Sequence, residues 1–104
     1  MSVTFTALYN PPADPELFDK HYDEVHTPLL AKLPNLEALT VVRPLPGPDG
    51  EKPAYHLIAS LTFPSPQALQ EAMASPEGQA AQEDIPNVAK DGVTTLVGPK
   101  SRVV

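Results

Sequence analysis

The positions of the prolines constrain the fold of this chain more than any other feature. Four prolines directly follow a residue with a good N-capping side chain, in the pairs Asp14-Pro15, Thr27-Pro28, Ser65-Pro66 and Ser75-Pro76. An N-cap residue takes an extended backbone, which is also the conformation that a residue before proline prefers. Proline at the first helical position then lacks only an N–H that would have no partner in the helix. Each pair therefore predicts the start of a helix or of a new helical segment.

The proline content also raises the question of whether the chain folds at all. The chain has 14 prolines in 104 residues, well above the average of roughly 5%, and disordered chains are often rich in proline. Most of these prolines lie at predicted element boundaries, so we interpret the chain as folded. Its length suits one domain over residues 1–104 with a single hydrophobic core.

The remaining segments predict four strands, because they are rich in β-branched and aromatic residues. These strands cover residues 3–9, 36–43, 54–63 and 93–97. One predicted helix runs from 15 to about 32, and a second runs from 66 to about 84 with a break at Ser75-Pro76. Pro86 is expected to end the second helix. The order β-α-β-β-α-β is typical of an α+β, ferredoxin-like fold with a four-stranded antiparallel sheet and both helices on one face.

Two helices cover only one face of such a sheet, so the other face needs its own explanation. In the segment 54–63, one alternating set is apolar and the other set mixes apolar with polar residues such as His56, Ser60 and Thr62. The segment 3–9 divides in the same way. A mixed face is compatible with solvent and also with one half of a partly polar dimer interface. The residues alone leave both interpretations open.

The composition argues against several classes of function. The formal net charge is −6 and the pI is about 4.8, whereas binding to nucleic acid or to anionic membranes needs clustered Lys and Arg. The absence of cysteine excludes disulfides, thiolate nucleophiles and cysteine-ligated metals. We see no signal peptide, and no apolar run approaches the roughly 20 residues of a membrane span. We therefore expect a soluble cytoplasmic protein.

The helix predicted over 15–32 carries residues that a purely structural helix does not need. At about 100° per residue, Tyr22 and His26 lie within its apolar stripe, whereas His21 lies toward the edge. We expect His26 to point inward or into a groove and His21 to be partly exposed. An inward histidine is more often a core residue bonded to a backbone carbonyl, and the periodicity leaves that alternative open.

Pro28 is expected to disturb this helix close to His26. It lacks an N–H and crowds the carbonyl of Glu24, and it disfavours helical angles at Thr27. We therefore predict a kink or a short break over residues 24–28. Irregular backbone beside a titratable side chain is frequent at functional sites.

Other polar residues give weaker signals. We interpret His56 as an ordinary strand residue, and we expect no metal site, because His21 and His26 are five residues apart rather than four. Asp84 is interpreted as a solvated surface residue at the end of the second helix, with a hydrogen bond to the first helix as the alternative. The sequence has no phosphate-binding loop, dinucleotide fingerprint or nucleophile elbow.

The segment from Pro15 to Leu39 resembles the start of the EthD family, whose members are small domains of the dimeric α+β barrel superfamily. The similar features are the aromatic Tyr22, a His-x-Pro-Leu motif that begins at His26, and a Leu-Pro-x-Leu motif that begins at Leu33. In the second half of the chain, the features that match are Phe63, the turn Ser75-Pro76-Glu77 and Asp84.

The resemblance implies that two copies pair through their open sheet faces and close a barrel. It also implies a pocket between helices and sheet with His26 at its wall. Relatives in the superfamily carry out cofactor-free lactone isomerisation, aldol cyclisation or oxygenation on small apolar or aromatic compounds. We therefore expect a homodimer that needs no cofactor and binds a small ligand of this kind, although fold kinship does not fix the reaction.

Two hypotheses for the function follow. In the first, the protein is an enzyme in which His26 is general base or acid and Tyr22 orients the substrate or donates to an enolate oxygen. Tyr9, Tyr55 and Asp84 are then the candidate substrate-binding residues. In the second, the protein is a non-catalytic, homodimeric ligand-binding or structural domain. A cavity that touches the His26 ring favours the enzyme, and a ring with both nitrogens bonded to protein favours the second hypothesis.

Overall fold

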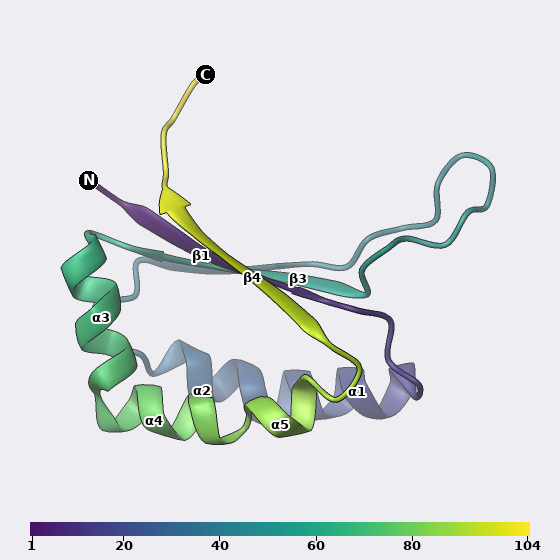
Figure 1. Cartoon of the computed structure of the whole chain (residues 1–104), viewed down its shortest axis with the longest axis horizontal. Helices are drawn as coiled ribbons and strands as arrows, with labels where there is room; N and C mark the ends of the chain where they lie inside the picture. Colours follow the sequence, from purple (N-terminus) through teal and green to yellow (C-terminus); the bar gives the residue numbers. More distant parts are fainter.

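The computed structural model describes all 104 residues and contains one four-stranded antiparallel sheet. The strands are β1 (Val3–Tyr9), β2 (Ala38–Val42), β3 (Leu57–Phe63) and β4 (Val93–Pro99). Their order in the sheet is β2-β3-β1-β4, and the helices lie below the sheet in Figure 1. This arrangement confirms the predicted ferredoxin-like fold.

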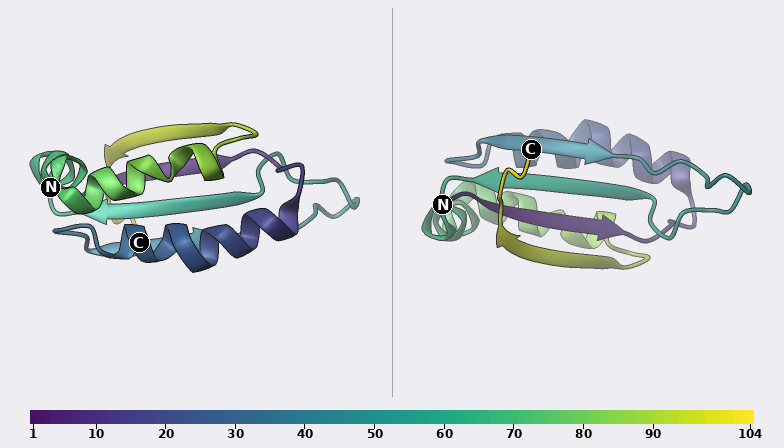
Figure 2. Two further views of the ribbon diagram at one scale, coloured as in Figure 1. Left: turned by 90° about the horizontal axis from the view of Figure 1, so that it is seen from below. Right: turned by 90° about the horizontal axis from the view of Figure 1, so that it is seen from above.

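The helical segments form two lines that lie side by side across one face of the sheet (Figure 2, left). The first line consists of α1 (Pro15–His21), a π-helical turn η1 (Tyr22–His26) and α2 (Thr27–Ala31). The second consists of α4 (Pro76–Glu83) and α5 (Ile85–Val88), and α3 (Pro66–Ala74) descends from one end of the sheet to join it. None of the helices combines the length and apolar character that a membrane crossing requires.

All four proline pairs mark the start of a helix or of a new helical segment, as predicted, since α2 begins at Thr27-Pro28. Only the other three pairs have a capping side chain. The side chains of Asp14, Ser65 and Ser75 each accept the backbone N–H of a residue three positions later, at 3.1, 3.0 and 3.0 Å. These bonds satisfy donors of the first turn that have no partner within the helix. The side chains that cap α1, α3 and α4 therefore fix where the helices begin under the sheet.

The predictions for Pro86 and for the ends of three strands need correction. Pro86 does not end the second helix; it lies in the first turn of α5, where proline is tolerated because its N–H would be unpaired anyway. The second and third strands are shorter than predicted. The fourth is longer, because Gly98 and Pro99 pair with Thr4 and Val3. A sheet admits proline there because β4 is an edge strand.

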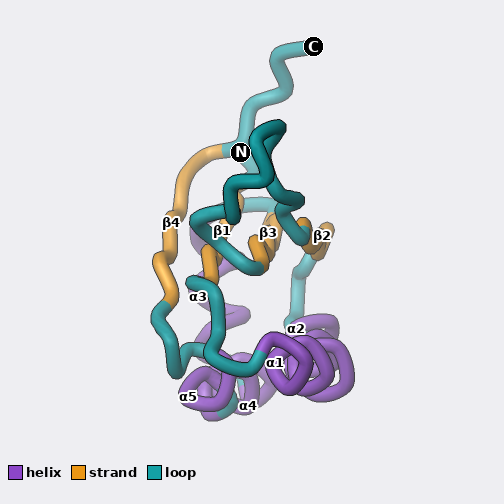
Figure 3. The backbone as a smooth tube through the Cα atoms, turned by 90° about the vertical axis from the view of Figure 1, so that its right-hand side faces the viewer, coloured by secondary structure: helices purple, strands orange, loops and turns teal.

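The core lies between the sheet and the helices (Figure 3). The alternating apolar sets of the first and third strands supply half of it, as predicted, since Val3, Ala7, Tyr9, Leu57, Ala59, Leu61 and Phe63 are all buried. The helices contribute Tyr22, Leu30, Leu33, Ala68, Ala72, Ala81 and Val88. The joint between α3 and α4 is especially tight, because a Cβ on Gly78 would lie 2.1 Å from the carbonyl oxygen of Ala72.

No helix covers the opposite face of the sheet, where the right-hand view of Figure 2 shows the strands in front. The cross-strand pairs Val42–Ile58 and Thr6–Leu96 place their side chains on this open face. Val42 is 56% exposed and Leu96 is 59% exposed. The open face is therefore mixed in polarity, as the sequence predicted, and it presents apolar side chains to its surroundings.

Candidate active site

The π-helical turn η1 explains how two histidines of the first helix meet. In a regular α-helix, residues five positions apart point about 140° away from each other. In η1, the N–H of Thr27 donates to the carbonyl of Tyr22, five residues earlier, and this wider turn brings the fifth residue back over the first. His21 and His26 therefore point to the same side. A uniform α-helix would place the two side chains on different parts of its surface, as the periodicity of the sequence predicts.

Pro28 accounts for the position of this turn. Its nitrogen has no hydrogen, so the carbonyl of Glu24 cannot receive the usual α-helical bond, and its ring crowds that carbonyl. The predicted irregularity is confirmed, but its form is different. Thr27 keeps helical angles, with φ −57° and ψ −46°, so the helix widens and does not break.

Asp84 is the point at which the two histidines converge. Its Oδ1 lies 2.8 Å from His21 Nε2, and its Oδ2 lies 2.9 Å from His26 Nδ1. The Asn87 amide donates to Oδ1 at 2.9 Å. Asp84 is only 7% exposed. The interpretation of Asp84 as a solvated residue was therefore wrong, and the alternative of a hydrogen bond to the first helix is correct.

The protonation state of this cluster follows from its hydrogen bonds. Burial alone would raise the pKa of Asp84, but hydrogen bonds from Asn87, His21 and His26 outweigh it and lower that pKa. The carboxylate is therefore ionised at neutral pH and can only accept, so Nδ1 of His26 must carry a proton. Burial lowers the pKa of His26, against the opposing effect of Asp84. His26 is then neutral, with an unprotonated Nε2.

A cavity of about 140 Å³ borders the ring of His26, between the sheet and the helices. We call it the inner cavity. Its walls are mainly apolar, with Phe5, Leu61 and Met73 among them, and the polar side chains that reach it belong to Tyr9, Tyr22, His26, Gln82 and Thr95. A dry cavity of roughly 150 Å³ accommodates benzene. The inner cavity therefore suits a compound of about one ring.

Tyr22 supplies a hydrogen-bond donor beside this cavity. Its hydroxyl is sealed from solvent and makes no hydrogen bond of normal length in the protein, although the Tyr9 hydroxyl lies close enough to raise its pKa further. Its ring centroid lies 5.1 Å from that of His26 and 5.4 Å from that of Tyr9. Burial raises the pKa of both tyrosines, so both stay protonated. A buried hydroxyl without a partner costs about 1–3 kcal/mol, and a ligand carbonyl would satisfy it.

Two of the residues singled out from the sequence lie elsewhere. Tyr55 is half-buried just before β3 and lines neither cavity described in this structure. His56 also precedes β3, and its Nε2 lies 2.8 Å from Asp19 Oδ1 on α1. His56 is thus part of a hydrogen-bonded pair, which corrects its interpretation as an ordinary strand residue. No group of three or more His, Cys, Asp or Glu residues is arranged to hold a metal ion.

Sequence reasoning missed the supporting residues of the cluster. His21 is partly exposed, as predicted, with 29% of its side chain accessible, but its bond to Asp84 was not predicted, and Asn87 was not considered at all. The spacing of Asn87, three residues after Asp84, is the only available signal, because residues three apart are neighbours on a helix. The signal applies only if the chain is helical at residue 87. Because Pro86 was expected to end the helix, α5 was not predicted and Asn87 was overlooked.

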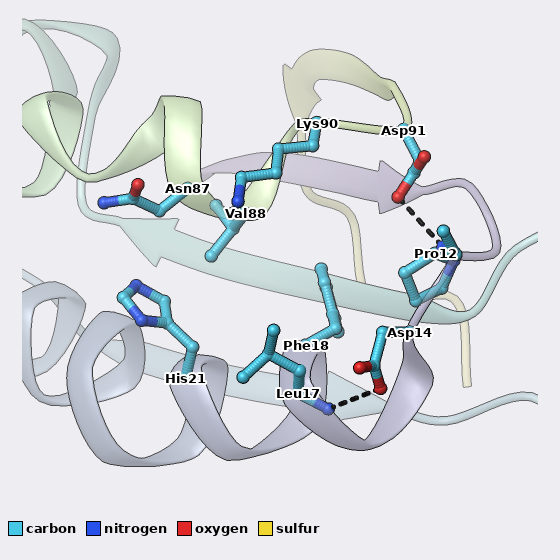
Figure 4. Close-up of a pocket in the computed structure, with 10 residues that line it drawn as sticks. Pro12, Asp14, Leu17, Phe18, His21, Asn87, Val88, Lys90 and Asp91 are labelled. Atoms are coloured by element: carbon cyan, nitrogen blue, oxygen red, sulfur yellow. Dashed lines mark hydrogen bonds between the residues drawn. The ribbon is translucent and has the colours of Figure 1, made fainter.

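A second and larger hollow of about 450 Å³ opens on the other side of His21 (Figure 4). We call it the outer groove. Its lining residues are Pro12, Ala13, Asp14, Leu17, Phe18, His21, Asn87, Val88, Lys90 and Asp91. His21 lines the outer groove and His26 lines the inner cavity. The carboxylate of Asp84 therefore connects the two spaces chemically.

Comparison with known proteins gives a consistent result. Residues 10–92 match the EthD domain family. An uncharacterized 11.0 kDa protein in the thcB-thcC intergenic region of Rhodococcus erythropolis is 38% identical over 99 residues, which are 95% of each chain. The crystal structure of an EthD family protein from Bacillus halodurans C-125 is 34% identical, with a TM-score of 0.89 over 97% of this chain and 100% of that one.

A more distant structure shares the fold. SnoaB, a cofactor-independent oxygenase from Streptomyces nogalater, is 17% identical, with a TM-score of 0.67. The match covers 99% of this chain and 95% of SnoaB. At this level of identity, the similarity establishes a common architecture.

Proposed function

Because this chain belongs to the EthD family, we propose that it is a small, cofactor-independent enzyme that moves a proton on an apolar or aromatic carbonyl or lactone compound. The observation that carries the proposal is the environment of His26. Its Nδ1 is bonded to Asp84, its Nε2 has no hydrogen-bond partner in the protein, and its ring borders the inner cavity. A structural core histidine would have both nitrogens satisfied by protein.

The proton transfer would use Nε2 of His26 as the base. Nε2 takes a proton from the carbon beside the substrate carbonyl: the C–H bond breaks, an N–H bond forms, and the electron pair moves to the carbonyl oxygen. The imidazolium formed is stabilised by the ionised carboxylate of Asp84. The hydroxyl of Tyr22 donates a hydrogen bond to the enolate oxygen. Return of the proton to a different atom gives an isomer.

The inner cavity also limits the charge of the substrate. No Lys or Arg lines it, and the histidine that does is neutral at neutral pH. A carboxylate would lose its hydration there without gaining a positive partner. The proposed substrate is therefore an uncharged compound of about one ring, with an acidic C–H beside a carbonyl.

Solvent hydrogen exchange tests this function without knowledge of the product. The protein is incubated in D₂O with a panel of small cyclic ketones, lactones and aryl ketones, and deuterium uptake beside the carbonyl is followed by NMR. We expect uptake by at least one compound above the buffer rate. His26→Asn should reduce this rate by at least about 100-fold, whereas the matched change His56→Asn should leave it intact.

The contrary outcome is that the protein binds ligands without catalysing exchange. If compounds of the panel raise the thermal stability of the protein by binding and none of them exchanges, the non-catalytic hypothesis replaces the enzyme.

A homodimer is the second part of the proposal. The open face of the sheet presents Val42 and Leu96 at more than half exposure, and no element of the chain covers it. A second copy, packed face to face, would remove these side chains from water. The family resemblance supports the same arrangement.

A further inference from the structure

The outer groove has the features of a binding site in its own right. We propose that it binds a small organic anion with an apolar body, such as an aryl-substituted or branched alkyl carboxylate. Its volume of about 450 Å³ falls within the usual range of roughly 300–1,000 Å³ for small-molecule sites, and the inner cavity, at about 140 Å³, is below that range. The proposal does not depend on whether His26 is catalytic.

Phe18 separates the outer groove from the inner cavity. It lines the groove, and on its other side it stacks on Tyr22 with ring centroids 5.6 Å apart. It also meets the ring of Tyr9 edge-on, at 5.6 Å. Both tyrosines line the inner cavity. A ligand in the groove therefore lies against the outer side of this aromatic wall.

The middle of the groove is apolar. Leu17, Phe18 and Val88 lie there (Figure 4). Leu17 lies in the first turn of α1 and is 61% exposed. Burial of a Leu side chain stabilises a complex by about 1.5–3 kcal/mol when it is complete. An apolar ligand body would provide that cover.

One end of the groove offers positive charge without a partner. Lys90 takes part in none of the ion pairs of the protein. His21 uses Nε2 to bond Asp84, and its Nδ1 has no hydrogen-bond partner in the protein. In Figure 4, Asn87, the ammonium group of Lys90 and His21 lie toward the same end of the groove. A ligand carboxylate fits this end.

The two carboxylates of the groove lie toward its other end and are already engaged. Asp14 accepts the N–H of Leu17 at 3.1 Å, and Asp91 accepts the N–H of Ala13 at 3.1 Å. Figure 4 shows both beside Pro12, away from His21. The groove is therefore polarised along its length, even though the whole chain carries a net charge of −6.

A ligand bound in the outer groove is expected to change the environment of His26. A ligand carboxylate at this end lies beside the ring that bonds Asp84, so it changes the electrostatic field at that shared carboxylate. The charged and titratable groups nearest His21 are Asp84 and His26 in the cluster and Lys90 at the same end of the groove, whereas Asp14 and Asp91 lie at the other end. Because Asp84 holds both histidines, a ligand in the groove changes the ring signals of His26 without touching it.

NMR titration of the full-length protein tests the proposal. The probe is 3-phenylpropionate, and the controls are 3-phenylpropanol, which has the same apolar body without charge, and propionate, which has the charge without the body. We expect saturable shifts at Leu17, Val88 and His21 with the acid, and weaker binding of both controls. Lys90→Gln should weaken binding of the acid roughly three- to fivefold, as expected for an exposed ion pair.

Lys100→Gln, which makes the same charge change in the C-terminal tail, should bind the acid as the wild type does. Leu17→Ser should weaken the binding of the acid and of the alcohol to the same extent, because it removes part of the apolar surface that both ligands contact. Three results would overturn the proposal: equal binding of acid and alcohol by the wild type, undiminished binding by Lys90→Gln, or shifts confined to the inner-cavity residues Leu61 and Met73. None of these readouts requires turnover, so they are independent of the exchange assay.

Discussion

His26 owes its chemistry to one neighbour, the carboxylate of Asp84. The carboxylate fixes the ring tautomer and leaves Nε2 unprotonated beside the inner cavity. Burial lowers the pKa of His26 against the opposing effect of the carboxylate. The folded protein therefore holds a neutral histidine where the unfolded chain has an ordinary one, and this difference makes stability depend on pH.

The sign of this dependence is fixed by the direction of the shift. As pH falls through the ordinary histidine pKa of about 6.5, the unfolded chain binds a proton at His26 before the folded protein does. The free energy of unfolding therefore falls with acidification, at most about 1.4 kcal/mol per pH unit for one group. The pKa of Asp84 is lowered as well, so its contribution persists above the ordinary aspartate pKa and is lost in stronger acid.

Urea unfolding at pH 7.5 and pH 5.5 checks this prediction. The wild type should lose more stability between the two values than His26→Asn, whose amide can still donate to Asp84 but cannot titrate. His56→Asn, which leaves the cluster at Asp84 intact, should behave like the wild type in this comparison. Equal pH dependence of the wild type and His26→Asn would mean that the pKa of His26 is not lowered by the fold.

At the scale of elements, the joint between α3 and α4 depends on a glycine. Gly78 is buried in the first turn of α4, and a Cβ there would lie 2.1 Å from the carbonyl oxygen of Ala72 and 2.6 Å from that of Met73. Both atoms belong to the backbone and cannot rotate away. Alanine normally stabilises a helix by about 1 kcal/mol relative to glycine, but here the clash reverses the sign.

We expect Gly78→Ala to lower the free energy of unfolding by about 2 kcal/mol or more, which is several degrees of melting temperature for a domain of this size. The matched control is Gly47→Ala in the loop between β2 and β3, where the nearest atom to a new Cβ lies 3.9 Å away. Denaturant unfolding of both variants provides the measurement. A stable Gly78→Ala protein would show that α3 and α4 can separate at this joint.

The contrast between caps and turns explains what the sequence could and could not predict for the elements. The caps of α1, α3 and α4 depend on a side chain and a backbone N–H three residues apart, so the sequence pattern is sufficient. The turn η1 depends on how the helix redistributes hydrogen bonds around Pro28, and several redistributions are compatible with one sequence. The choice between them decides where His21 points. The inward position of His26 and Tyr22 was predicted, and a bond from Asp84 to the first helix was one alternative, but the convergence of both histidines on Asp84 was not predicted.

At the scale of the whole molecule, the two faces of the sheet differ in how they are covered. The helices bury one face completely enough to form the core, and the other face carries a mixed surface from all four strands. The hydrogen bond between Thr4 and Thr62 hydroxyls, at 3.3 Å, shows that part of this polarity is satisfied within the face. The apolar remainder includes Val42, Ile58 and Leu96, and this remainder is what a partner copy would cover.

We therefore expect light scattering after size exclusion to give about twice the chain mass of 11.1 kDa. Leu96→Asp should shift the protein toward the monomer, because two copies packed face to face would bring unpaired carboxylates into a poorly hydrated interface, where each is costly. The matched control is Leu45→Asp, which adds the same charge at a loop residue that is 84% exposed and should leave the mass unchanged. Leu96 pairs with Thr6 across two strands of the open face, so the change touches none of the residues that line the inner cavity. A wild-type monomer at micromolar concentration would mean that the open sheet face lies in solvent. A dimer that tolerates Leu96→Asp would mean that the two copies meet through another surface.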